Sequence, residues 1–305
     1  MKKLWTKVLF LILIIWAATA VITSIIDSKE TTQPVMAVEE KPRAFKLLLE
    51  NIDNLPNPKL KSASAILIDL DEGEVLMSKN ITEVRPIASL TKLVTAIVFL
   101  NTLPNMSQMM TVTREDKEGA GRSRLYSGES VSLYDLFNLM LICSDNAAAR
   151  VVARSTGMDD EEFAARMNEY ALGLDLEYTH FSDPTGLDPC NVSTAAECSI
   201  ILKTALDNVL IKEVMSRRNY SFKPVNGKRT YTVHNTNRML FGREDIIGGK
   251  TGYIYESGYC LALGFEINDG RKLGAVVLGA PTSGTRFRDA ARMLAGMNSA
   301  QHAVN

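Results

Sequence analysis

The order of strand-like and helical segments restricts the fold of this chain more than any other feature. Near the start, SASAILIDL and EVLMSKN flank DEG, which is the arrangement of a β-hairpin that begins near Ser62. Near the end, IIGGKTGYI, GYCLALGFEIN and KLGAVVLGA are short runs rich in β-branched or aromatic residues and separated by turn residues such as NDG. These segments predict two strands early and three strands late, and we expect all five in one antiparallel sheet.

A long helical block separates the two groups of strands. Apolar residues recur three and four apart from about Ser89 to Leu210, for example in SLYDLFNLMLICSDNAAARVVARS and DDEEFAARMNEYALGL. After the last strand, TRFRDAARMLAGM predicts a closing helix. If the two groups of strands share a sheet, the helical block must form its own subdomain and leave a groove at the junction. The predicted fold is therefore α/β (α+β): a five-stranded antiparallel sheet flanked by helices, with an inserted all-helical subdomain.

The first 26 residues predict export. Lys2, Lys3 and Lys7 precede an uncharged run over 8–26, which is just long enough to span a bilayer as a helix. Lysines ahead of the apolar run are what positive-inside orientation requires. Because ATA at 18–20 offers a small-residue cleavage site, the segment is either a signal peptide or an N-terminal membrane anchor.

The rest of the chain divides by composition into a linker, one domain and a short tail. Residues 27–59 mix charges with prolines and predict a linker, 60–298 hold the periodic segments, and 299–305 form the tail. With the lysines inside, this domain faces outward, where disulfides can persist. The four cysteines are too few and too irregularly spaced for a disulfide scaffold, although Cys190 and Cys198 could pair locally.

Several common functions lack their sequence signals. With 34 basic and 35 acidic residues there is no charge surplus for a polyanion, so nucleic acid is not an expected partner. The three histidines, His180, His234 and His302, have no metal-ligand spacing, and we expect no metal and no cofactor. GGKTG is not a phosphate loop because its opening glycine would fall at Glu244, and no GxSxG elbow occurs.

Ser89 and Lys92 lie three residues apart in the greasy segment PIASLTKLVTA and form the first candidate pair. A serine hydroxyl is a weak nucleophile and needs a base within hydrogen-bond reach, which helical spacing supplies here. Among neighbouring apolar side chains the ammonium is costly to desolvate, so the pKa of Lys92 should fall far enough for a neutral amine to accept a proton. An N-cap serine beside a lysine that reaches solvent would explain this SxxK alone equally well.

Two further motifs change that balance. Ser144-Asp145-Asn146 interrupts an apolar helical stretch, and Lys250-Thr251-Gly252 lies in a predicted strand whose glycines suit close approach by a ligand. A helix cap and a charged strand edge could account for each one separately. All three motifs, in this order and on these types of element, are far less expected by chance.

SxxK, SDN and KTG together are similar to the signature of the penicilloyl-serine transferases, which include penicillin-binding proteins and serine β-lactamases. The resemblance covers residues 62–298 and is closest to the low-molecular-mass D-alanyl-D-alanine carboxypeptidases and endopeptidases. FSDPTGLDPCNVSTAAE and HNTNRML resemble segments typical of that group, and GRSRLYSGES resembles the endopeptidase branch. The fold of that family agrees with the predicted layout.

The resemblance implies a role for each matching position. Ser89 would attack the carbonyl between two D-alanines, Lys92 would take its proton, and Ser144 would pass a proton to the departing amine. The remaining positions would bind substrate. These are Asn146 for the peptide amide, Lys250 and Thr251 for the terminal carboxylate, Gly252 for close approach, and the backbone N–H of Tyr253, with that of Ser89, for the oxyanion.

The function implied is that of a serine-type D-Ala-D-Ala carboxypeptidase acting on peptidoglycan stem peptides, with β-lactams as covalent inhibitors. It would work in the extracytoplasmic bacterial envelope, secreted or held to the membrane by the N-terminal segment. Endopeptidase cleavage of cross-bridges is the alternative. Many carboxypeptidases of the family have glycine where Asp145 stands and carry a β-rich C-terminal domain, so Asp145 leaves the substrate open and anchoring would fall to the N-terminus.

Two other functions are weaker alternatives. A class A β-lactamase needs a glutamate-positioned water, usually in an ExxLN segment, and none is present; the glutamates in other contexts are Glu161, Glu162, Glu169, Glu177 and Glu197. A non-catalytic β-lactam receptor would need a sizeable cytoplasmic portion, whereas about seven residues precede Val8.

Overall fold

A computed structural model describes residues 59–304, with the exceptions of 122 and 269. The predicted N-terminal segment 1–26 and the linker 27–59, apart from its last residue, lie outside the described residues, and the assigned domain limits stay predictions. No helix within the described part of the chain has both the length and the apolar character needed to cross a bilayer.

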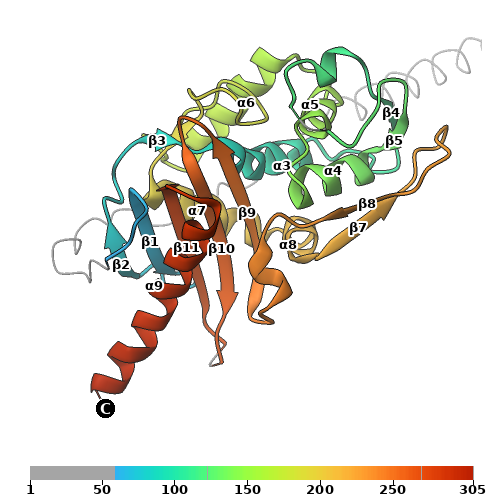
Figure 1. Ribbon diagram of the computed structural model, residues 1–305. Coiled ribbons are helices and arrows are strands. Elements are labelled where there is room, and N and C mark those ends of the chain that lie inside the picture. The colour runs from blue at the N-terminus through green and yellow to red at the C-terminus, as the bar shows by residue number, and fades with distance from the viewer. Residues whose placement is uncertain (1–58, 122, 269, 305) are drawn as a thin grey trace, which may run out of the picture. The chain divides into compact units, whose positions relative to one another are not determined.

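Five strands form the single antiparallel sheet that the sequence predicts, in the order β2-β1-β11-β10-β9 (Figure 1). Their bounds are β1 Ser64–Asp69, β2 Val75–Lys79, β9 Ile246–Ile254, β10 Gly258–Glu266 and β11 Lys272–Ala280. The early and late strands meet where β1 pairs with β11, for example through Ile66 and Val276. Strand β9, which carries the third motif, is therefore left at one edge of the sheet.

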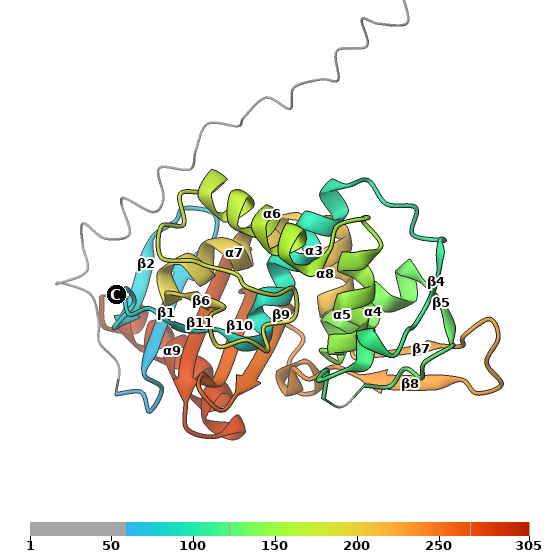
Figure 2. The same ribbon diagram turned by 90° about the horizontal axis from the view of Figure 1, so that it is seen from above.

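Helices cover both faces of the sheet. Their bounds are α3 Thr91–Asn101, α4 Leu133–Ile142, α5 Asn146–Arg154, α6 Asp160–Gly173, α7 Ala195–Asp207, α8 Val209–Ser216 and α9 Ser283–Val304. Alternate residues of β1 point to opposite faces, so Ile66 packs in the large core shared with α3, α4, α5 and α7. Leu67 packs in the smaller core under the closing helix α9 (Figure 2).

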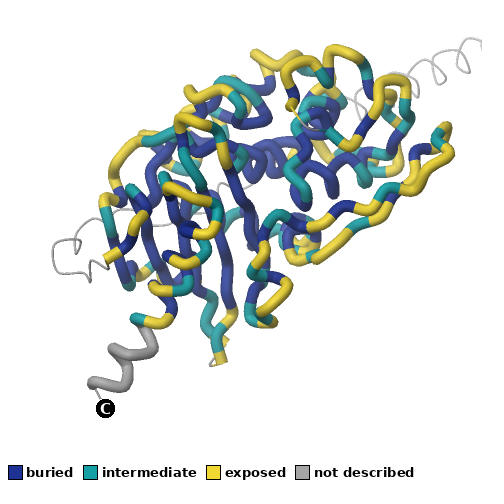
Figure 3. The backbone as a smooth tube through the Cα atoms, viewed as in Figure 1, coloured by how far each residue is buried: buried dark blue, intermediate teal, exposed yellow. Residues whose placement is uncertain are grey.

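Most residues of the central strands and of α3 are buried (Figure 3). Helix α3 carries the first motif into this interior, since nine of its residues, including Lys92, are buried. The apolar segment around Lys92 is thus a core helix beside the sheet.

The inserted region is mainly helical, as predicted, but it also contains short ladders that the sequence analysis did not identify. These are β3 Arg85–Pro86 with β6 Val192–Ser193, β4 Met109–Thr111 with β5 Ser130–Ser132, and β7 Asn219–Phe222 with β8 Tyr231–His234. Within the described residues, three 3-10 turns complete the elements: η2 Ala88–Leu90, η3 Glu115–Lys117 and η4 Arg238–Phe241. Ladders of two to four residues satisfy backbone groups of packed loops and are too short to produce a periodic pattern.

Candidate active site

Ser89 and Lys92 lie together where α3 begins. Ser89 is in the 3-10 turn η2 and Lys92 is in the first turn of α3, so the pair spans the junction rather than one helix. The Ser89 Oγ and the Lys92 Nζ are 3.0 Å apart. Ala88, directly before the serine, has a φ of 47°, a left-handed conformation that costs a non-glycine residue about 1–2 kcal/mol. The surrounding structure must therefore hold this turn in place.

The Lys92 amine is completely buried and is surrounded by oxygen atoms. Besides Ser89, its Nζ lies 2.6 Å from Asn146 Oδ1 and 2.5 Å from the Thr185 carbonyl oxygen. Burial lowers the pKa of Lys92 to about 7, although the negative charges of Asp183 and Asp145 oppose that shift. A substantial fraction of the amine is therefore neutral near neutral pH and able to accept a proton.

The loop after α6 holds the Thr185 carbonyl against Lys92. Asp183 Oδ1 accepts hydrogen bonds from the N–H groups of Thr185 at 2.5 Å and Gly186 at 2.8 Å, and its Oδ2 accepts one from Asn191 Nδ2 at 2.7 Å. Burial alone would raise the pKa of Asp183, but hydrogen bonds from the Thr185 hydroxyl and from the N–H groups of Asp188, Thr185 and Gly186 bring it below its ordinary value. Gly186 has a φ of 77°, and a Cβ there would lie 2.1 Å from the Ala88 carbonyl oxygen. The loop thus braces the strained turn that carries Ser89.

The third motif reaches the serine from the sheet edge. Gly252 in β9 packs directly on η2, because a Cβ at this position would lie 2.9 Å from the Ile87 carbonyl oxygen and 3.1 Å from the Ser89 nitrogen. Lys250, two residues earlier on the same strand, is buried. Glycine is therefore what lets β9 approach Ser89 so closely.

Ser144 connects the helical side of the site to Lys250. Its backbone turns sharply between α4 and α5 with a φ of 61°. The Lys250 Nζ donates to Ser144 Oγ at 2.7 Å and to the Thr251 carbonyl at 2.9 Å. The pKa of Lys250 lies well below its usual value because of burial and then because of the positive charge of Lys92; Arg286 acts in the same direction and only the Cys143 thiol opposes them.

Asp145 holds the helical wall together. Its Oδ1 accepts from the Ala148 N–H at 3.0 Å and so caps α5, while both carboxylate oxygens accept from Ser123 Oγ, at 3.0 and 2.9 Å. Its Oδ2 also accepts from the Arg124 N–H at 2.8 Å. Asp145 thus ties the preceding loop to the second motif.

Asn146, the first residue of α5, has its amide held at both ends. Its Oδ1 accepts from Lys92, and its Nδ2 donates to the Ala120 carbonyl at 2.9 Å. One N–H of the Nδ2 group remains for another partner.

The sequence analysis did not identify two residues at the site, Thr236 and Arg286. Thr251 Oγ1 donates to Thr236 Oγ1 at 2.7 Å, and buried Arg286 of α9 donates from Nη1 to the Gly252 carbonyl at 2.9 Å. Burial lowers the pKa of Arg286 to about 10. Thr236 lies in the HNTNRML segment, so a signal existed for it. Arg286 lies in an ordinary charged helix, and only the packing of α9 under the sheet reveals it.

Tyr253 follows Gly252 at the end of β9. Its side chain is half exposed and stacks on Tyr259 of β10, with ring centroids 4.3 Å apart. The role of its backbone N–H stays a prediction.

Other chemistries have little support in the described part of the chain. Glu197 is buried and accepts from the Tyr178 N–H and the Thr179 hydroxyl, and Glu169 pairs with Arg166, so neither is free to activate water beside Ser89. No group of three or more metal-ligating side chains occurs among the described residues. The local disulfide between Cys190 and Cys198 is not formed, since all four cysteines are free.

Comparison with protein families finds one match that spans most of the domain. The profile of the family described as D-alanyl-D-alanine carboxypeptidase matches residues 52–282. A D-alanyl-D-alanine endopeptidase of Escherichia coli is 33% identical over 241 residues, which is 77% of this chain and 77% of that protein. The D-alanyl-D-alanine carboxypeptidase DacF of Bacillus subtilis is 31% identical over 240 residues, which is 77% of this chain and 61% of that protein.

Solved structures agree with these sequence matches. The crystal structure of a Streptomyces DD-transpeptidase superposes with a TM-score of 0.75 at 25% identity and covers 80% of this chain and 100% of that one. A D-alanyl-D-alanine carboxypeptidase from Mycobacterium tuberculosis superposes with a TM-score of 0.72 at 26% identity and covers 81% and 94% of the two chains.

Proposed function

Because the chain belongs to the D-alanyl-D-alanine carboxypeptidase family, we propose that it removes the terminal D-alanine from peptidoglycan stem peptides through an acyl-enzyme on Ser89. The arrangement of three oxygen atoms around the Lys92 amine is the observation that carries this proposal.

A neutral amine has two N–H groups and one lone pair. The Asn146 Oδ1 and the Thr185 carbonyl oxygen can only accept hydrogen bonds, so they take the two N–H groups of Lys92. The lone pair is then left facing Ser89 Oγ, the one neighbour that has a proton to give. The site thus supports removal of the serine proton as the hydroxyl attacks the substrate carbonyl.

Ser144 and Lys250 support departure of the leaving group. Ser144 Oγ accepts from the Lys250 Nζ and can turn its own proton toward the departing amine, with Lys250 replenishing it. The acyl group would remain on Ser89 until water attacks it. The proton that the water loses would pass through Ser144 to the neutral Lys250, and the proton that Lys92 took would return to Ser89 as the ester breaks.

Lys250 and Thr251 would receive the substrate carboxylate. Among the described residues, Lys250 donates to a hydroxyl and a backbone carbonyl and forms no ion pair with a carboxylate. An incoming carboxylate supplies that missing negative charge and would favour the protonated form of Lys250. We place the Asn146 amide on the substrate peptide and the N–H groups of Ser89 and Tyr253 at the oxyanion, where a donor is worth roughly 3 kcal/mol in other acyl transferases.

The experiment is incubation of the purified domain with a stem pentapeptide, followed by mass analysis of the products. We expect release of one D-alanine by the natural protein and none by Ser89→Ala. A fluorescent penicillin should label the natural protein covalently and leave Ser89→Ala unlabelled. Penicillin turnover without D-alanine release would instead favour a β-lactamase.

Cleavage of peptidoglycan cross-bridges is the second candidate function. It is favoured by relatives named D-alanyl-D-alanine endopeptidase, which align over similar fractions of both chains, as the E. coli protein does at 77% of each. The two reactions share the D-alanyl acyl-enzyme and differ only in the size of the departing amine. A cross-linked muropeptide supplied beside the pentapeptide separates them, because an endopeptidase would convert the dimer into monomers and release no free D-alanine.

Peptidoglycan lies outside the cytoplasmic membrane, so the proposed reaction is extracytoplasmic. We propose that residues 1–26 direct the chain there and either are removed or remain as an anchor. Sequencing the N-terminus of the protein from a membrane fraction distinguishes the two, since an anchored chain retains its first residues.

A further inference from the structure

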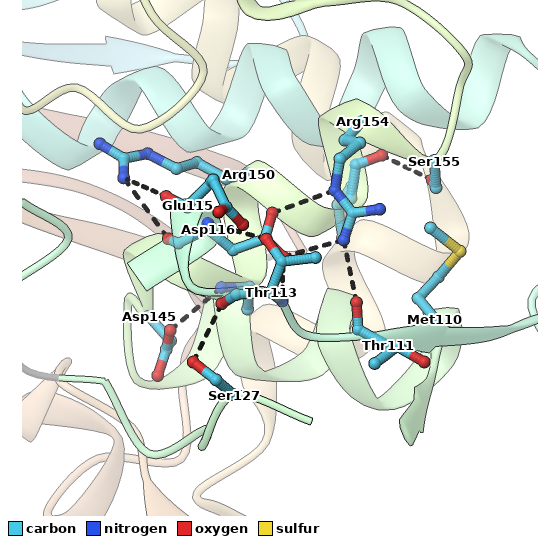
Figure 4. Close-up of polar contacts among 12 residues, drawn as sticks. Met110, Thr111, Thr113, Glu115, Asp116, Ser127, Asp145, Arg150, Arg154 and Ser155 are labelled. Carbon is cyan, nitrogen blue, oxygen red and sulfur yellow. Dashed lines mark hydrogen bonds and ion pairs between the residues drawn. The ribbon is translucent and has the colours of Figure 1, made fainter. Parts of the chain in front are cut away.

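Two arginines one turn apart on α5 hold the segment that precedes α4 (Figure 4). Arg154 forms a two-pronged ion pair with Asp116, with Nε to Oδ1 at 3.0 Å and Nη2 to Oδ2 at 2.8 Å. Its Nη2 also donates to the Thr111 carbonyl at 3.1 Å. Asp116 is buried and accepts from the Thr113 N–H at 2.7 Å, so both ends of this ion pair are firmly held.

Arg150 contacts backbone carbonyls of the 3-10 turn η3, which contains Asp116. Its Nη1 donates to the Glu118 carbonyl oxygen and lies 3.4 Å from the carbonyl oxygens of Glu115 and Asp116. These carbonyls belong to the 3-10 turn η3 and to Glu118, which follows it; the Glu115 carbonyl also accepts from the Glu118 N–H at 3.2 Å. A planar guanidinium can serve several such oxygens at once, which an ammonium cannot do equally well.

The turn that Arg150 holds leads directly to the site. Ala120 is buried, its N–H donates to the Lys117 carbonyl at 3.1 Å, and its own carbonyl accepts from Asn146 Nδ2 at 2.9 Å. Because Arg150 and Asn146 are four residues apart on one helix, the contacts form a closed ring from α5 through η3 and Ala120 back to α5.

The orientation of the Asn146 amide decides whether Lys92 can act as a base. With the oxygen toward Lys92, Asn146 takes an N–H of the amine. If the amide turned over, its NH2 group would donate to the lone pair of Lys92 and oppose proton removal from Ser89. The Ala120 carbonyl prevents this, because it can pair only with the NH2 end of the amide.

We propose that Arg150, braced by the Arg154–Asp116 ion pair, is a positioning residue that fixes the Asn146 amide through the Ala120 carbonyl and so keeps the lone pair of Lys92 for Ser89. This inference rests on the serine peptidase chemistry proposed above and adds a residue that lies in none of the three motifs. It differs from a purely stabilising role because the effect of Arg150 must pass through Asn146.

A double-mutant cycle tests that route. The rate constant for acylation by a fluorescent penicillin is measured for the natural protein, Arg150→Met, Asn146→Ala and the double variant. We expect Arg150→Met to slow acylation about tenfold, within the range of coupling energies for residues in one network. In the Asn146→Ala background the same substitution should change the rate less than twofold. Equal losses in both backgrounds would overturn the proposal.

Two further variants control for the loss of any arginine and for misfolding of Arg150→Met. Arg166→Met removes an exposed arginine that pairs with Glu169 on α6, and we expect no change in acylation. If Arg150→Met does not fold, Arg150→Lys replaces it in the cycle, since lysine keeps the charge but offers the η3 carbonyls a poorer match. An Arg150→Lys protein that is acylated at the natural rate would contradict the proposal.

A measurement without substrate separates this inference from the proposed function. In the natural protein the side-chain amide proton of Asn146 that is bonded to the Ala120 carbonyl should exchange slowly with solvent by NMR, and Arg150→Met should accelerate that exchange severalfold. If the natural protein is neither acylated nor releases D-alanine, the proposed function falls while the exchange data still decide the role of Arg150. Unchanged exchange in a folded Arg150→Met protein would overturn the inference.

Discussion

The two walls of the site are built in different ways. On the sheet side, β9 brings Lys250 and Gly252 to the serine along a regular ladder with β10, so backbone pairing sets their positions. On the helical side, Ser144 and Asn146 lie at a break between two helices, where side chains bonded to loop backbone set the positions. The positions of residues on the sheet wall should therefore change little when a polar group is lost, but they should change when atoms are added. On the helical wall, loss of a polar group should be the more disruptive change.

The largest effect is expected where the walls meet, at Lys92. Lys92→Met keeps the length of the side chain but removes the base, so acylation by penicillin should fall at least a thousandfold, in line with loss of a base that activates a nucleophile. Stopped-flow fluorescence or gel labelling measures the rate. Lys203→Met, which removes an exposed lysine paired with Asp207, is the control and should react normally.

Added atoms on the sheet wall come next. Gly252→Val places a Cβ within 3 Å of the Ile87 carbonyl, so β9 or η2 must move and acylation should fall about a hundredfold. At Gly242 an added Cβ meets nothing within 4 Å, and Gly242→Val should therefore leave the rate unchanged. A fully active Gly252→Val protein would show that the sheet wall tolerates displacement, and it would contradict the proposed difference between the two walls.

Loss of a polar group on the helical wall should slow acylation less than Gly252→Val does and should lower the free energy of unfolding. Asp145→Ala removes the cap of α5 and the anchor of the preceding loop, so we expect about 1 kcal/mol or more of lost stability and about tenfold slower acylation. Asp159→Ala removes the cap of α6, which lies outside the three motifs. Urea unfolding should show a similar loss for both, whereas acylation should slow only for Asp145→Ala.

The smallest effect is the dependence of the rate on pH. With a pKa of about 7, Lys92 is half neutral at pH 7 and about one tenth neutral at pH 6. Because burial depresses this pKa, the active form is lost as pH falls through 7, and kcat/KM for pentapeptide should drop about fivefold between pH 7 and 6. A profile that is flat over this range would place the base elsewhere.

The same contrast explains which features the sequence could predict. The strands follow from local patterns, and so does the nearness of Ser89 and Lys92, which depends on three residues of spacing. Lys250 was singled out only because its motif, together with the other two, resembles a family signature. The contacts of the helical wall join residues such as Ala120 and Asn146 across 26 positions, and no periodic pattern reports such a pairing.

Two details of the structure go beyond the sequence prediction, for related reasons. The inserted subdomain, which was predicted as all-helical and is mainly helical, also contains ladders such as β4–β5 that are too short for periodicity to reveal. Ser89 lies in a 3-10 turn at the start of α3, because packing by Gly186 and Gly252 shapes that turn from outside. Both details depend on partners that are distant in sequence.

The insertion of Gly186 against the Ala88 carbonyl also has a consequence for biogenesis. The turn at Ala88 emerges early in synthesis, but the glycine that supports it follows almost a hundred residues later and β9 follows later still. An incomplete nascent polypeptide would hold every atom of the nucleophile and yet lack the geometry that makes it reactive. Covalent labelling by penicillin would then mark only chains that have finished folding, so the time course of labelling would report the rate of secretion and folding in living cells.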